Sequence, residues 1–104
     1  MSRIEKIKAM LEDDPHDTFL RYSLAMEQEK IGEHVDSEAG LRALMAGDPS
    51  YVPAFFMLAQ HLAGRQQVAA AREVLRSGIE VARDQQDAHA AGEMSEFLAS
   101  LGAE

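Results

Sequence analysis

The chain of 104 residues carries 18 acidic and 10 basic side chains, for a net charge of −8, and 46% of its residues are hydrophobic. This length suits one modest domain with a packed core, and the negative charge argues against nucleic-acid phosphates and anionic membranes as partners. Because there are no cysteines, disulfide frameworks and thiolate metal sites are excluded. The amino-terminal segment lacks the apolar core of a secretory signal, and no apolar run approaches the roughly 20 residues that span a bilayer, so we expect a cytoplasmic protein.

The first two predicted helices show apolar positions at helical spacing between recognisable start and stop signals. The first covers residues 3 to 12 and opens with a capping box formed by Ser2 and Glu5. The second covers residues 17 to 30, and Gly32 is well placed to end it in the left-handed conformation.

Four further helical segments follow in chain order. The third is expected to begin at Asp36 as its N-cap and to run to Gly47. The others cover residues 51 to 64, 68 to 85 and 87 to 101. No segment alternates apolar and polar residues with the period of two that marks a strand. The sequence therefore predicts an all-α antiparallel array of five to six helices.

An internal repeat relates these segments. The dipeptide Asp14-Pro15 recurs as Asp48-Pro49, and a period of 34 marks tetratricopeptide arrays among helical repeats. The same offset carries apolar positions onto apolar positions: Ile7 onto Leu41 and then Leu75, Leu24 onto Leu58, and Ala25 onto Ala59. Positions that recur in this way must meet the same environment between helices, so we expect burial of Leu24, Ala25, Leu58, Ala59, Leu75 and Ile79.

The pattern resembles the tetratricopeptide repeat family, in which each repeat is a pair of antiparallel helices. Residues 52 to 83 match it best, with Phe55 at the large-residue site, Leu58-Ala59 as the Leu-small pair and Ala71 at the small crossing site. Residues 18 to 49 depart from it, because Arg21 and Ser37 stand at the large-residue and small crossing sites. In the last helix the same register puts His89 at the large-residue site, so we expect that side chain to pack in the core.

The resemblance implies a small, bacterial-type protein with about two and a half repeats and a right-handed superhelical arrangement. We expect one domain over residues 1–104, divided into a half repeat (1–15), a first repeat (16–49), a second repeat (50–85) and a capping helix (86–104).

The resemblance also implies a function, because ligands of this family usually lie on the concave surface made by the first helix of each pair. Carried over residue by residue, the peptide-binding groove comprises Phe19, Tyr22, Met26, Glu29, Phe56, Met57, Gln60 and Met94. The expected function is a protein-binding or peptide-binding adaptor. The alternative is a structural homo-oligomer that buries its groove or an end helix against another copy.

The excess of acid in residues 12 to 48, ten acidic against three basic side chains, favours a cationic or amphipathic helical partner. No two histidines stand three or four residues apart, and no Gly-rich phosphate loop is present, so we expect no metal, no cofactor and no catalytic residue. The acidic run of residues 12 to 17 is interpreted as a solvated turn between helices.

Overall fold

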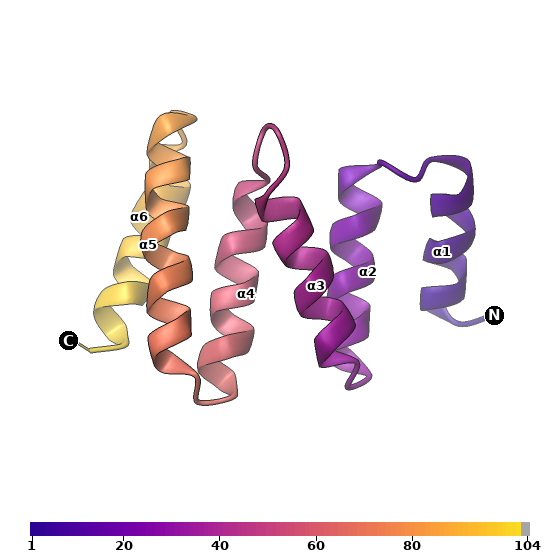
Figure 1. Cartoon of the computed structure of the whole chain (residues 1–104), viewed down its shortest axis with the longest axis horizontal. Coiled ribbons are helices and arrows are strands. Elements are labelled where there is room, and N and C mark those ends of the chain that lie inside the picture. Colours follow the sequence, from indigo (N-terminus) through magenta and orange to yellow (C-terminus); the bar gives the residue numbers. More distant parts are fainter. Residues whose placement is uncertain (103–104) are drawn as a thin grey trace. The chain divides into compact units, whose positions relative to one another are not determined.

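A computed structural model describes residues 1–102, and within that range all regular structure is helical, without strands (Figure 1). The chain divides into two compact units, Met1–Tyr51 (unit 1) and Val52–Glu104 (unit 2). Unit 1 contains α1 (Arg3–Asp13), α2 (Thr18–Lys30) and α3 (His34–Met45), and unit 2 contains α4 (Val52–Gly64), α5 (Val68–Asp84) and α6 (Ala88–Ser100). The predicted all-α class is confirmed, and the predicted repeat boundaries stay a prediction.

In unit 1, α2 packs against both α1 and α3. The capping box predicted at the start of α1 is present, since Glu5 N donates to Ser2 Oγ at 3.1 Å and Ser2 N donates to Glu5 Oε1 at 2.8 Å. Gly32 ends α2 in the left-handed region, with φ +86°, as predicted. Asp36 is not the N-cap of α3. That helix begins earlier, at His34, which places the Asp36 carboxylate in the first turn, where the helix dipole favours negative charge.

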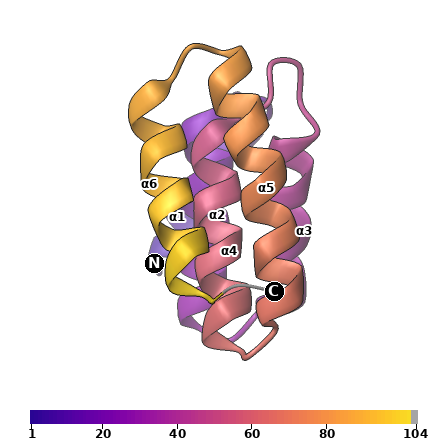
Figure 2. The ribbon, with the colours of Figure 1, turned by 90° about the vertical axis from the view of Figure 1, so that its left-hand side faces the viewer.

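In unit 2, the three helices run alternately up and down, and each contacts the other two (Figures 1 and 2). Phe55 of α4 fits against Gly78 of α5, where an added Cβ would lie only 2.7 Å from Phe55 Cβ and 2.7 Å from Met94 Sδ. The apolar core of this unit includes Leu58, Leu62 and Leu75, all of which are buried. Gly78 therefore allows a close crossing of helices that any side chain would obstruct.

Burial follows the repeat closely. Ala25, Leu58, Ala59, Leu75 and Ile79 are buried as predicted. The recurring set Ile7, Leu41 and Leu75, on α1, α3 and α5, is buried throughout, with Ile7 exposed by 4% and Leu41 and Leu75 by 0%. The prediction was wrong for Leu24, which is only half-buried.

Candidate partner-binding surface

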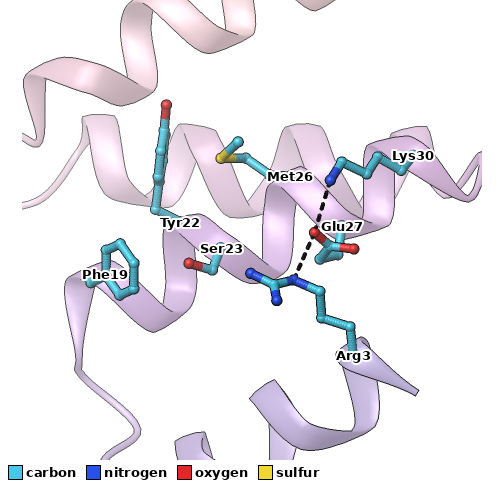
Figure 3. Close-up of a pocket in the computed structure, with 7 residues that line it drawn as sticks. All are labelled: Arg3, Phe19, Tyr22, Ser23, Met26, Glu27 and Lys30. Carbon is cyan, nitrogen blue, oxygen red and sulfur yellow. Dashed lines mark hydrogen bonds and ion pairs between the residues drawn. The ribbon is translucent and has the colours of Figure 1, made fainter.

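An open hollow of about 240 Å³ lies along α2 in unit 1 and brings together three of the predicted groove residues. Figure 3 shows Phe19, Tyr22 and Met26 along α2, with Arg3 reaching in from α1. The three α2 residues stand at spacings of three and four, which places them on one face of a helix. Ser23, Glu27 and Lys30 complete the lining.

Phe19 is the most accessible apolar group of this hollow, with 69% of its surface exposed. Met26 and Tyr22 are half-buried. An exposed aromatic ring beside a methionine is a candidate contact site, because apolar groups that gather on a surface often mark the place where another molecule binds.

Tyr22 has a partner of its own. Its ring meets that of Tyr51 edge to face, with centroids 5.4 Å apart and planes at 72°. Burial, together with the neighbouring Tyr51 hydroxyl, raises the pKa of Tyr22 above its ordinary value, so the phenol is neutral at physiological pH. The contact with Tyr51 therefore holds the Tyr22 ring in place at the edge of the hollow. Within residues 1–102, Phe19 takes part in neither of the two ring pairs.

The charged side of the hollow is organised around Glu27. Its Oε2 accepts from Lys30 Nζ at 3.1 Å and from Arg3 Nε at 3.0 Å (Figure 3). The hydrogen bond from Lys30, with the charges of both cations and the bond from Arg3, holds the pKa of Glu27 below its ordinary value, so the carboxylate stays ionised. Both cations remain well exposed, with side-chain exposures of 71% for Arg3 and 66% for Lys30. Each has further N–H donors that can bind a second acceptor.

Glu29 does not line this hollow. Its Oε1 lies 3.0 Å from His34 Nδ1 at the start of α3, and the Glu29 side chain is only 19% exposed. The predicted groove set of unit 1 is therefore brought together for Phe19, Tyr22 and Met26, while Glu29 links α2 to α3.

In unit 2 the predicted residues have mixed surroundings. Phe56 of α4 meets Phe97 of α6 edge to face, with centroids 5.7 Å apart. Met57 is half-buried and Gln60 is exposed. Met94 is 1% exposed and lies in the core beside Gly78, so it is not at the surface of this unit.

A change in the repeat spacing explains the position of Met94. The helices α2, α4 and α6 begin at Thr18, Val52 and Ala88, so the residue number advances by 34 at the first step and by 36 at the second. The N-caps agree, because Asp17 accepts from Leu20 N and Asp87 accepts from Ala90 N. With two extra residues before α6, Met94 takes the inward position of Leu24 and Leu58.

The same shift corrects the expectation for His89. This residue faces solvent, with 85% of its side chain exposed, and pairs with Glu93 at 3.4 Å instead of packing in the core. Ala91, which is buried, takes the large-residue position. The longer α5, which extends to Asp84, accounts for the shift, and the sequence showed no separate signal for it.

Sequence reasoning missed four residues of the hollow: Arg3, Ser23, Glu27 and Lys30. The spacing of Glu27 and Lys30, three apart on one helix, was an available signal for an ion pair. Arg3 is 24 residues from Glu27 and belongs to another helix, so only the packing of α1 on α2 brings it to the site.

The acidic turn between α1 and α2 has a local role. Asp17 caps α2 through Leu20 N at 2.9 Å, and Glu12, Asp13, Asp14 and His16 are exposed. Over residues 1–102, no three His, Asp or Glu side chains gather in a way that could hold a metal ion. In the same range, no helix has the length and apolar character needed to cross a membrane.

Comparison with solved structures identifies the fold. A tetratricopeptide repeat domain protein from Salinibacter ruber matches with a TM-score of 0.78 and 28% identity, over 85% of this chain and 89% of that one. A protein from Bordetella parapertussis matches with a TM-score of 0.80 and 28% identity, over 97% of this chain and 88% of that one. No family model matches the sequence, and no curated protein matches it. The chain thus has a tetratricopeptide-like fold, as the repeat predicted, and folds of this kind typically act in protein interactions and not in catalysis.

Proposed function

We propose that the chain is a non-enzymatic adaptor that binds another protein or peptide, and that the hollow along α2 is part of its binding surface. The observation that carries this proposal is the exposed Phe19 ring, which stands beside Met26 and Tyr22 and next to two cations that retain free donors. Apolar anchors flanked by polar groups are the usual composition of an interaction hot spot.

The groove residues of unit 2 take a supporting place in this proposal. Phe56 and Met57 are half-buried, and Gln60 is exposed, so these side chains of α4 offer contact area to a partner. A substitution at Phe56 also removes its ring contact with Phe97. Weaker binding by such a variant could therefore result from weaker packing between α4 and α6 as well as from loss of a partner contact.

Phe19 gives the cleaner test. A Phe19→Ala variant should keep its helicity and melting temperature, because the ring contributes little to the core. We expect capture of the partner, identified by crosslinking to the wild-type chain and then purified, to weaken by about tenfold or more. His89→Ala, at an exposed site in unit 2, is the matched control. Undiminished capture by a folded Phe19→Ala variant would place the binding surface elsewhere.

A homo-oligomer is the second candidate, and the exposure of Phe19 and Met10 favours it as well. Sedimentation at micromolar concentration separates the two functions. A concentration-independent dimer that dissociates on Phe19→Ala supports the oligomer, whereas a monomer that captures another protein supports the adaptor.

A further inference from the structure

Two more hollows adjoin α1 and α2, in addition to the one along α2. One of about 150 Å³ is lined by Lys6, Met10 and Phe19 among others, and one of about 220 Å³ includes Lys8 and Ile31. Arg3 lines all three. We call this surface the α1–α2 face and define it by Arg3, Lys6, Met10, Phe19, Met26 and Lys30.

Unit 2 shows what the corresponding place can hold. There the α5–α6 pair is covered by a third helix, α4, whose Phe55 lies against Gly78 and whose Phe56 lies on Phe97. By the repeat, α5 corresponds to α1 and α6 corresponds to α2. Within residues 1–51, no third helix covers this pair as α4 does in unit 2, because α3 packs mainly on α2.

Side-chain exposure differs between the two units at equivalent repeat positions. Met10 stands at the repeat position of Gly78 and is 47% exposed. Leu24, at the position of Met94, is half-buried, whereas Met94 is 1% exposed. Apolar groups that α4 covers in unit 2 therefore remain partly open in unit 1.

The charge of the α1–α2 face indicates which kind of partner it can bind. The two hollows that share Phe19 are lined by three basic residues, Arg3, Lys6 and Lys30, and by one acidic residue, Glu27. This is a local positive excess in a chain whose net charge is −8. Glu27 is already shared by Arg3 and Lys30, and both cations are well exposed, so a second acceptor can reach them.

Resting on the adaptor function, we propose that the α1–α2 face binds an acidic amphipathic helix of a partner protein. Its apolar side chains pack on Met10, Phe19 and Met26, and its carboxylates pair with Arg3, Lys6 and Lys30. Because Met10 replaces a glycine, the incoming helix sits farther out than α4 does in unit 2, or presents a small residue at that point. Arg3 and Lys6, at the repeat positions of Ala71 and Val74, then replace apolar packing by charge pairing.

The test uses two synthetic helices and the isotope-labelled chain. Both probes are capped, alanine-based peptides of about four turns, long enough to hold helical structure, with Leu at helical spacing on one face. One carries Glu beside the Leu stripe and the other carries Lys at the same places. We expect the acidic probe to shift the backbone amide resonances of α1 and α2, and to bind about tenfold more tightly than the lysine probe, with an affinity that falls as salt is added.

Variants locate the effect. Lys6→Glu alone, and Arg3→Glu with Lys6→Glu, should weaken the acidic probe progressively, by about tenfold for the double change. Arg76→Glu, an exposed charge reversal in α5, is the control, and circular dichroism verifies folding of each variant. The Lys6→Glu variant remains informative if loss of the Arg3 ion pair disturbs α1, because Lys6 forms no ion pair within residues 1–102.

Three results overturn the proposal: unshifted amides of α1 and α2 at millimolar acidic probe, equal or tighter binding of the lysine probe, or full affinity in the folded double variant. A preference for the lysine probe would instead favour a cationic partner drawn by the acidic residues 12 to 48. None of these results removes the adaptor function, which depends on capture of the native partner and its loss in Phe19→Ala.

Discussion

Units 1 and 2 build the same helix pair from different side chains. In unit 2 the pair α4–α5 has Phe55, Leu62 and Ala71 at three of its inward positions, and all three are buried. In unit 1 the same repeat positions hold Arg21, Gln28 and Ser37. Ser37 is fully buried, and its hydroxyl donates to the carbonyl oxygen of Ala25 at 2.7 Å. At this crossing the small Ser37 side chain links α3 to α2 by a hydrogen bond, where unit 2 has an apolar contact at Ala71.

This contrast suggests that the two units contribute differently to stability and to binding. Burying apolar surface contributes roughly 25 cal/mol per Å², so the unit with the larger apolar core gains more from packing. Among the described residues, most buried apolar side chains lie in α4, α5 and α6, whereas unit 1 contributes Ile7, Ala25, Leu41 and Leu44. We infer that unit 2 supplies most of the stability, while unit 1 displays apolar groups such as Phe19 that a partner can cover.

The largest expected effect tests this contrast at one repeat position. Leu58→Ala removes a side chain that is 0% exposed, and should lower the free energy of unfolding by about 2 to 5 kcal/mol. Leu24→Ala, at the equivalent position of the preceding repeat, removes a half-buried side chain and should cost less than half as much. Denaturant titration followed by circular dichroism measures both. Equal losses would break the comparison, because they would mean that unit 1 is packed as tightly as unit 2.

The second effect sharpens the comparison at Gly78, where α4 and α5 cross closely in unit 2. Alanine in place of Gly78 should destabilise by about 1 to 3 kcal/mol, because its Cβ would lie 2.7 Å from Phe55 Cβ, and this exceeds the gain of about 1 kcal/mol in helix propensity. Gly92→Ala in α6 is the control, since a Cβ there meets nothing within 4 Å, and it should stabilise. The melting temperature should fall for Gly78→Ala and rise for Gly92→Ala. A Gly78→Ala variant as stable as the wild type would show that the helix crossing can widen without a loss of stability.

The fold was largely predictable because its determinants are local and periodic. Apolar spacing, the capping box at Ser2 and the glycine at position 32 each act within one or two helical turns, and all three are present as predicted. The offset of the repeat then related the helices of one unit to those of the other. It overestimated the burial of Leu24, and it failed before α6, where α5 is longer and the step between repeats lengthens, which misplaced His89 and Met94.

The candidate site was predictable only in part. Phe19, Tyr22 and Met26 share a face of one helix, so the repeat could group them. The link from Arg3 to Glu27 depends on how α1 packs on α2, and the ring contacts of Tyr22 and Phe56 depend on two residues far along the chain, Tyr51 and Phe97. Periodicity carries no information on such contacts between helices.

The smallest effect concerns the turns that close α2 and α4. Gly32 and Gln66 occupy the same repeat position, and both have positive φ, +86° and +66°. A left-handed conformation costs a residue with a Cβ roughly 1 kcal/mol or more, and glycine avoids this cost. Gln66→Gly should therefore stabilise unit 2 by about 0.5 to 1 kcal/mol, after the greater flexibility of glycine in the unfolded chain is subtracted.

The reverse exchange provides the matched control. Gly32→Gln places a side chain where nothing lies within 4 Å, so crowding is absent and the expected loss of about 1 kcal/mol comes from the backbone alone. Denaturation midpoints of the two single variants and of the double exchange measure the stability change that each substitution causes. If the turns are equivalent, the double exchange should lie close to the wild type, because the two sites are in separate units and their effects add. A Gln66→Gly variant that is less stable than the wild type would contradict this prediction. It would mean that the Gln66 side chain stabilises the turn by more than its left-handed backbone conformation destabilises it.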